Sequence, residues 1–398
     1  MQAVEQSIVR QDFTGALRLL DQNEKNARDR VLQLMNRGAL LRMAGNYRES
    51  NVAFEQGKQL SAELQAVSLR EQTAAMSIQE GLKSYVGDDY ERVFLHLLTA
   101  FNYLDVGDFD GARVEALQLD VELGKLTADG YRDDAFARYV SGLIFDALNE
   151  RDDAMIAYRR ASELYADKAR NFGVPLPAKL QADLLRLSEQ LGFTDEFEKY
   201  RAEFGASAVQ PKMAAGFGEV VVLIQVGLAP RKREHSIMVQ DGGRLIRIST
   251  PHYPPRPPRA LTVNVTASGE TVFAELGQDI DAMARRQLDA GMGAIVARAI
   301  ARAVVKTKLS QELEKKNGLA GLAVNIAGVI TETADTRSWS TLPEKIYLAR
   351  LRLPAGEHDI SVRFDGSGGM VERTLARVKV KAGKKVFSSL AWSPAGVR

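Results

Sequence analysis

Residues 35–60, MNRGALLRMAGNYRESNVAFEQGKQL, contain the clearest helical repeat in this chain. Its turn Gly45-Asn46-Tyr47 repeats the pattern of Gln11-Asp12-Phe13. In each copy a small residue and then a bulky apolar residue follow the turn at the same offsets: Ala16 and Leu20 in the first copy, Ser50 and Phe54 in the second. The interval between the copies (45 − 11) matches the period of tetratricopeptide repeats, about 34 residues, in which each unit is one helix–turn–helix. Such units bury their apolar faces only by stacking, so the sequence predicts a curved helical scaffold.

Related but less regular units follow, up to about residue 205. The interval from Gly45 to the next turn, at Gly107, falls short of two periods, and the interval from Gly107 to Asn149 exceeds one. We therefore expect a bent, partly irregular α-solenoid, with a generic helical bundle as the alternative. Pro175 and Pro177 must end a helix, and two further helices, 178–191 and 195–204, are predicted to close this region. The small and large residues that mark the later units are Gly107, Phe109, Ala112 and Ala116, and then Gly142, Phe145, Ala154, Tyr158 and Ala161.

The composition of the chain argues against a nucleic-acid-binding protein, a metalloprotein and a membrane-spanning protein. A chain of 398 residues suggests two or three domains. With 53 basic and 51 acidic residues it has a net charge of +2, which gives no bulk attraction to nucleic acid or to acidic membranes. There is no cysteine, and four histidines leave little for a metal centre. The longest apolar runs are too short to span a bilayer. The chain opens in charged helical sequence without a signal segment, so we expect a cytosolic protein or one whose export signal was removed.

The periodicity changes after a small-residue linker, 206–217. Glu219 to Val226 is a continuous β-branched run, which predicts a strand buried on both faces. Further strands are predicted over 236–239, 245–248 and 261–265, with a hairpin turn at Asp241-Gly242-Gly243. A proline cluster, 251–258, is interpreted as a stiff connector, and the alternative is a docking peptide for an aromatic groove.

A long amphipathic helix is predicted from Asp279 to about Lys316. Its apolar stripe favours packing on the adjacent sheet, and its basic faces leave open a position on an anionic membrane. An apolar, small-residue segment follows at 318–330, so residues 279–331 are a candidate helical hairpin for self-association.

The chain ends in short strands separated by glycine turns. Strands are predicted over 346–353, 359–364, 371–380 and 386–392, a pattern typical of a small antiparallel sandwich. The fold class is therefore α+β and multidomain: a tetratricopeptide-like α-solenoid over 1–205, a linker over 206–217, and a mixed α/β domain over 218–398 that contains an antiparallel β-sheet and the long amphipathic helix.

Four stretches of the helical half stand out besides the repeat: 85–93, 100–108, 112–116 and 134–142. Together with 335–343 and Ala349-Arg350 in the second half, they resemble a largely uncharacterised family of bacterial tetratricopeptide-like lipoproteins. The resemblance covers most of the chain and is most distinctive at 335–343 and at Ala349-Arg350; the turn 353–358 resembles the PEGA-type β modules of envelope proteins. It implies an exported, periplasmic scaffold tethered to the outer membrane, whereas this sequence holds no cysteine to carry a lipid. The family assigns no catalytic residues.

The sequence holds no motif that predicts an enzyme, a cofactor site or a metal site. His-Glu-x-x-His and Gly-x-Ser-x-Gly are missing. Gly366-Ser367-Gly368-Gly369 lacks the lysine of a phosphate loop and is interpreted as a hairpin tip. Asp105, Asp108 and Asp110 crowd one turn but lack the acidic residue that completes a calcium loop. Catalytic, cofactor-binding and metal-ligating residues are therefore all predicted to be absent, although a carboxylate pair formed by spatial neighbours stays open.

We therefore predict a non-enzymatic protein–protein interaction scaffold that binds its partner in a concave solenoid groove, where Asn36, Arg37, Asn102 and Tyr139 are candidate contacts. Two alternatives remain: an envelope enzyme or enzyme activator acting in cell-wall synthesis, and a membrane-associated oligomer that uses residues 279–331. A cleft between the two halves lined by paired carboxylates would favour the enzyme.

Overall fold

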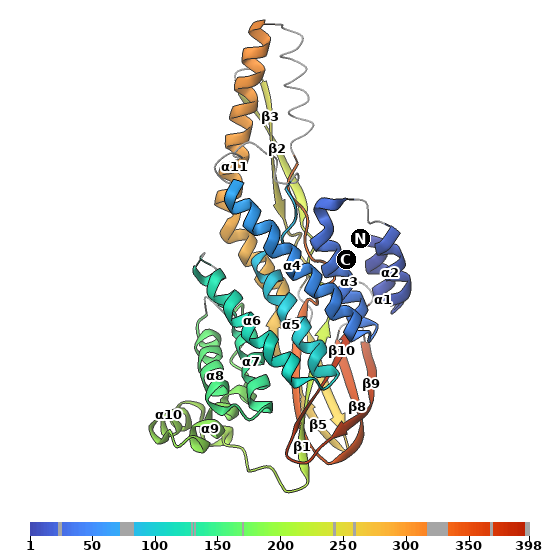
Figure 1. The fold of residues 1–398 in the computed structure, drawn as a ribbon, viewed down its shortest axis with the longest axis vertical. Helices are drawn as coiled ribbons and strands as arrows, with labels where there is room; N and C mark the ends of the chain where they lie inside the picture. The colour runs from blue at the N-terminus through green and yellow to red at the C-terminus, as the bar shows by residue number, and fades with distance from the viewer. Residues whose placement is uncertain are drawn as a thin grey trace.

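The computed structural model describes residues 1–22, 26–71, 83–128, 130, 133–168, 171–241, 244–257, 260–316, 333–366 and 369–394. The N-terminal half forms consecutive helices that stack side by side (Figure 1). They are α1 (Gln2–Val9), α2 (Phe13–Gln22), α3 (Arg30–Met43), α4 (Tyr47–Glu71), α5 (Asp89–Asp105), α6 (Phe109–Ala128), α7 (Ala135–Ala147), α8 (Arg151–Ala166), α9 (Ala178–Gln190) and α10 (Thr194–Phe204), with short 3₁₀ turns at Ala27–Asp29 and Ala206–Ala208.

Five described helical hairpins share one turn geometry. One residue in each turn has a positive φ, between 62° and 80°, and its N–H and the next N–H bond back to carbonyls of the last helical turn. This is the Schellman ending, which glycine and asparagine adopt at the least cost. The repeat in the sequence is therefore a repeat of this turn, and its irregular spacing follows from unequal helix lengths. The five turn residues are Gln11, Gly45, Gly107, Asn149 and Gly192.

Two hairpins also share the close approach that defines tetratricopeptide packing. Gly38 on α3 faces the ring of Phe54 on α4, and Gly142 on α7 faces the ring of Tyr158 on α8, with the same separation along the chain in both pairs. A Cβ placed on either glycine would lie 2.3 Å from the ring, so only glycine allows this separation of the helices. The predicted positions of Phe54, Gly142 and Tyr158 as the large and small residues of the repeat are confirmed, and the helical half is a tetratricopeptide-like array.

The C-terminal half contains two four-stranded sheets. Sheet A has the order β10-β1-β7-β6, and sheet C has the order β5-β4-β8-β9. Every pairing in these two sheets is antiparallel except that of β1 with β10, which is parallel. The predicted antiparallel sandwich therefore needs this correction: the chain crosses from sheet C to sheet A between β9 and β10, and β10 then runs beside β1 in the same direction. The strands are β1 (Phe217–Val226), β4 (Leu261–Ala267), β5 (Glu270–Phe273), β6 (Glu275–Asp279), β7 (Lys345–Pro354), β8 (Gly356–Gly366), β9 (Gly369–Val380) and β10 (Lys385–Trp392).

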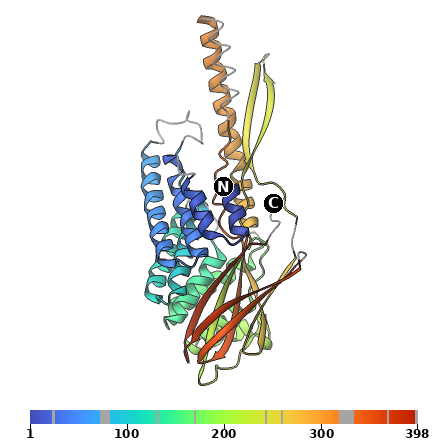
Figure 2. The same cartoon turned by 90° about the vertical axis from the view of Figure 1, so that its right-hand side faces the viewer.

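Sheet A is the middle of three layers (Figure 2). Strand β1 alternates between two cores: Val220, Val222 and Ile224 pack in the sandwich with sheet C, while Val221 and Leu223 join the core of the solenoid. The prediction that this strand is buried on both faces is confirmed. Because side chains alternate along a strand, one sheet closes the sandwich and also covers the inner side of the helices.

An arm projects from the body at one end. It consists of α11 (Ile280–Lys316) and the antiparallel hairpin of β2 (Arg233–Asp241) and β3 (Arg244–His252), which extend from the same end of the molecule (Figures 1 and 2). The start of α11 is buried in the solenoid core through Ile280, Met283 and Leu288. The predicted helix is confirmed in its bounds, but its buried stripe packs on the solenoid core as well as on strands. Residues 318–330, the second part of the predicted self-association hairpin, lie outside the described residues. No helix in the described part of the chain is long and apolar enough to cross a membrane.

Candidate binding cleft between the solenoid and the sheet

The inner face of the solenoid is occupied by the protein's own C-terminal half. Trp339 is fully buried and meets the ring of Phe54 edge-on, with 5.8 Å between ring centroids. Its backbone N–H donates to Glu91 of α5 at 2.7 Å, and its indole N–H donates to Thr341 at 2.9 Å. The segment 333–344, which we name the Trp339 segment, thus lies where a tetratricopeptide groove would hold a partner. The bond between Trp339 and Glu91 brings together two of the stretches that carry the family resemblance, 335–343 and 85–93.

Two of the four candidate contact residues bind the C-terminal half directly, and a third reaches it through Arg42. Asn36 accepts from Thr341 at 2.9 Å, and Asn102 accepts from Arg42, which in turn donates to Ser389 of β10 at 2.7 Å. Tyr139 accepts from Arg350 of β7 at 3.2 Å. Asn36, Asn102 and Tyr139 are at most 2% exposed, so the structure corrects the prediction that they contact a partner chain. Arg37 is about half exposed and pairs with Asp21 at 2.6 Å.

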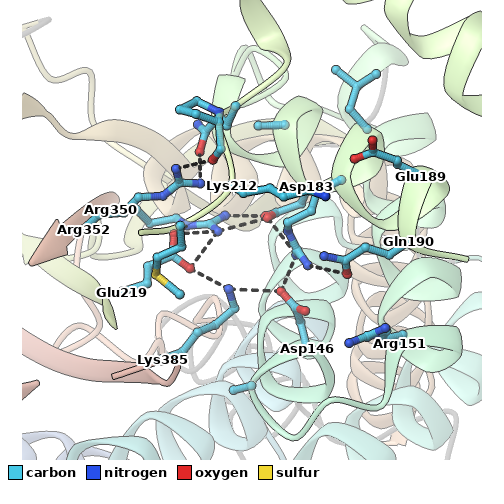
Figure 3. Close-up of a pocket in the computed structure, with 18 of the residues that line it drawn as sticks. Asp146, Arg151, Asp183, Glu189, Gln190, Lys212, Glu219, Arg350, Arg352 and Lys385 are labelled. Carbon is cyan, nitrogen blue, oxygen red and sulfur yellow. Dashed lines mark hydrogen bonds and ion pairs between the residues drawn. The ribbon is translucent and has the colours of Figure 1, made fainter. Parts of the chain in front are cut away.

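Three carboxylates and three cations form a closed ring across the interface between the solenoid and sheet A (Figure 3). Each carboxylate contacts two cations and each cation contacts two carboxylates, with all contacts at 3.2 Å or less. The order around the ring is Asp183 (α9), Arg350 (β7), Glu219 (β1), Lys385 (β10), Asp146 (α7), Arg186 (α9) and back to Asp183. Two of these pairs, Asp183–Arg350 and Asp146–Lys385, join the solenoid directly to the sheet.

The ring lowers the pKa of two of its carboxylates, Glu219 and Asp183. Burial alone would raise the pKa of Glu219, but Arg350 and Lys385 outweigh it and hold that pKa well below its usual range. Burial likewise opposes ionisation of Asp183, yet Arg350 and Arg186 lower its pKa. A general acid needs a proton near neutral pH, and these two carboxylates have none to give. The cleft between the halves and the paired carboxylates that would favour an enzyme are thus both present, and each of these carboxylates contacts two cations.

An open cleft of about 750 Å³ lies over this ring. Helices α7 to α9 form one wall, and β1 and β7 with the start of β10 form the other. Residues 209–213 of the connector to β1 also line the cleft. Outside the ring, four basic side chains line the cleft against one acidic side chain, Glu189. We name these four the rim cations: Arg151, Lys212, Arg352 and Lys384.

The other candidates from the sequence have structural roles. Asp105 is buried against Arg42 at 3.0 Å, and Asp108 caps α6 by accepting from the N–H of Gly111 at 2.9 Å. Within the described ranges, no three histidine or acidic side chains are placed to hold a metal ion. His96 contacts Glu115 at 3.0 Å, and Glu115 also binds Lys58.

Two glycine- or proline-rich stretches connect strands. Gly366 and Gly369 are paired ends of β8 and β9, while Ser367 and Gly368 lie outside the described residues. In the proline cluster, Arg256 donates to the carbonyl of Leu228 at 2.8 Å, and Arg285 of α11 donates to the carbonyls of Tyr253 and Pro254. These bonds hold the cluster as a connector between β3 and β4.

Sequence reasoning missed the ring, although part of its signal was readable. Glu219 opens an otherwise apolar strand, and Arg350 interrupts another, so each places a charge where burial is expected. A charge in such a strand requires a buried partner. What the sequence does not contain is the partner's position, because Asp183 and Asp146 lie on helices of the other half.

Comparison with known proteins finds distant likeness only. Neither a protein family nor a curated protein matches the chain. Among solved structures, the chain is similar to MamA (16% identity, TM-score 0.33, 51% of this chain and 93% of that one) and to the apo form of RapI (11%, 0.37, 50% and 49%). It is also similar to a tetratricopeptide repeat protein from Parabacteroides merdae (14%, 0.33, 51% and 63%). None of these likenesses is close enough to assign an activity or a partner to this chain.

Proposed function

We propose that this protein is a non-enzymatic interaction scaffold of the bacterial cell envelope, which holds its own C-terminal half on the inner face of the solenoid and binds a partner protein on the outer face. The inner face is filled by the Trp339 segment and by sheet A. A partner must therefore use surface that the intramolecular contacts leave free, and the outer helices α4, α6 and α8 supply it.

One observation carries the proposal. Val52, Val114 and Ile156 occupy the same position in three successive hairpins, seven residues after the turn residues Gly45, Gly107 and Asn149. Their exposed fractions are 58%, 50% and 63%. Because successive repeats stack in register, we treat these three side chains as one outer row. Contiguous exposed apolar patches mark interaction surfaces, and the outer row is the surface that we assign to the partner.

The terminal hairpins do not continue the outer row. The equivalent positions, seven residues after Gln11 and Gly192, are the exposed side chains of Arg18 and Lys199. Polar ends are typical of repeat arrays, in which terminal units face water. Helix α6 adds two more exposed apolar side chains near Val114: Leu117 and Val121 are 44% and 58% exposed.

Photo-crosslinking in the native host tests the scaffold. A photoreactive phenylalanine analogue at position 114 or 156 is expected to give an adduct of discrete mass with another protein. The same analogue at positions 18 and 199 is the matched control, because those positions are equivalent by repeat and polar by sequence. Adducts of discrete mass at 114 and 156 alone support the outer row; equal adducts at all four positions, or none, overturn it.

The envelope placement rests on the sequence resemblance to bacterial lipoproteins. Fractionation of native cells, followed by detection of the chain with an antibody, is expected to recover it with the envelope. Recovery only with cytosolic marker proteins would overturn this part of the proposal and leave the outer row untouched.

A further inference from the structure

We propose that the cleft over the ion ring binds an extended acidic peptide segment of a second protein. The site is separate from the outer row and lies where the last hairpins of the solenoid meet sheet A. The inference does not rest on the outer row, and either surface can fail its test alone.

Charge complementarity is the first reason. The ring is balanced, with three carboxylates against three cations, so it presents no net charge to a ligand. What remains of the charged lining is the four rim cations and Glu189. Charges of one sign in a cleft with low-dielectric walls concentrate a ligand of the opposite sign.

The rim cations are also available. Among the described residues, none of them contacts a carboxylate: Arg352 donates to the carbonyl of Pro211 at 2.7 Å and to the side chain of Gln210 at 2.8 Å, and Arg151 donates to Asn149 at 3.1 Å. Lys212 and Lys384 are exposed. A ligand carboxylate can therefore pair with them without displacing an existing ion pair.

The distribution of these cations favours a peptide over a compact anion. They come from separate elements: Arg151 begins α8, Lys212 lies in the connector, and Lys384 precedes β10. A single phosphate needs donors that converge on one point, whereas several carboxylates spaced along a chain match cations spaced around a rim.

Apolar side chains in the same cleft favour a ligand with apolar groups between its charges. Val209 and Met213 in the connector are 42% and 37% exposed, and Phe197 and Leu185 also line the cleft. Peptide sites combine an apolar wall with a few polar groups that fix orientation. A nucleic acid or polyphosphate chain offers no aliphatic side chains for this wall.

The test is fluorescence anisotropy with the full chain and a labelled octapeptide of alternating glutamate and leucine. Saturable binding is expected at about 50 mM salt, with weakening at about 500 mM because screening shortens the reach of exposed charges. The double variant Lys212→Glu, Lys384→Glu is expected to lose about tenfold or more in affinity, since each reversal replaces an attraction with a repulsion.

Two controls keep the outcome decisive. The variant Arg18→Glu, Lys199→Glu carries the same charge change on exposed positions that do not line the cleft, and it is expected to bind within about twofold of the parent chain. An octapeptide of alternating lysine and leucine is expected not to bind. Absence of saturable binding, or an equal loss in both double variants, overturns the proposal. Competition by inorganic polyphosphate as strong as by the unlabelled peptide, at equal charge, would instead assign a general polyanion site and also overturn it.

Discussion

The guanidinium of Arg350 on β7 is buried against the carboxylate of Asp183 on α9, a residue 167 positions earlier in the chain. On its other side Arg350 donates to Glu219 of β1 at 2.9 Å and 3.0 Å. One arginine thus spans the boundary between the helical half and the sheet, and its charge is balanced from both sides. The two halves are therefore held together by buried ion pairs as well as by an apolar core.

Arg350→Met is expected to lower the free energy of unfolding by about 3–5 kcal/mol, because it leaves two buried carboxylates without their common cation. The measurement is urea unfolding followed by circular dichroism. The control is Arg363→Met, which removes an arginine whose ion pair with Asp365 is 49% and 40% exposed. That change is expected to stay within about 0.5 kcal/mol. Equal shifts for the two variants would contradict a structural role for the ring.

Gly142→Ala is expected to destabilise the protein by about 1–3 kcal/mol, because the new methyl group would force α7 and α8 apart. Its Cβ would lie 2.3 Å from the Tyr158 ring. Gly124 on α6 is the matched control, since a Cβ there meets no atom within 4 Å. Gly124→Ala is expected to raise stability by about 0.5–1 kcal/mol, as alanine is the better helix former. Thermal unfolding of both variants checks the sign, and stabilisation by Gly142→Ala would refute the proposed close approach.

Glu91→Gln is expected to gain stability over the parent chain as pH rises. Burial first, and then the neighbouring Asp88, raise the pKa of Glu91 to about 7, against the lowering effects of Lys232, the Trp339 N–H and Tyr85. Because the pKa of Glu91 is higher in the folded state than in the unfolded state, its protonated form contributes to the free energy of unfolding. This contribution is fully present below pH 4.5 and is lost as pH rises through 7. Glutamine at position 91 is neutral at every pH, so the variant keeps this contribution as pH rises.

The difference in unfolding free energy between Glu91→Gln and the parent chain is expected to grow by on the order of 3 kcal/mol between about pH 4.5 and pH 8. Urea unfolding at a series of pH values measures it. Glu198→Gln, at an exposed position paired with Arg201, is expected to differ from the parent by no more than about 0.5 kcal/mol at each pH. A difference for Glu91→Gln that is flat with pH would show that the fold does not raise the pKa of Glu91.

Much of the local structure could be predicted because it depends on neighbours in sequence. The turn at Gly45, the helix after Pro177 and the doubly buried strand at 219–226 follow from backbone preference and from the period of apolar residues. The same reasoning misjudged Asn36, Asn102 and Tyr139. Each has the polarity and repeat position of a partner contact. Asn36 and Tyr139 instead bind the chain's own C-terminal half, and Asn102 accepts from Arg42, which binds Ser389.

Turn chemistry and apolar periodicity act between near neighbours in the chain, so the residues alone specify stacked helical hairpins followed by a strand-rich half with one long helix. The folded chain was needed to show that the second half fills the inner face of the first. It was also needed to show that Asp146, Asp183, Glu219, Arg350 and Lys385 meet with Arg186 in one ring. The ion pairs of that ring that cross between the halves join residues far apart in the chain, and no local preference encodes which buried charge will face which.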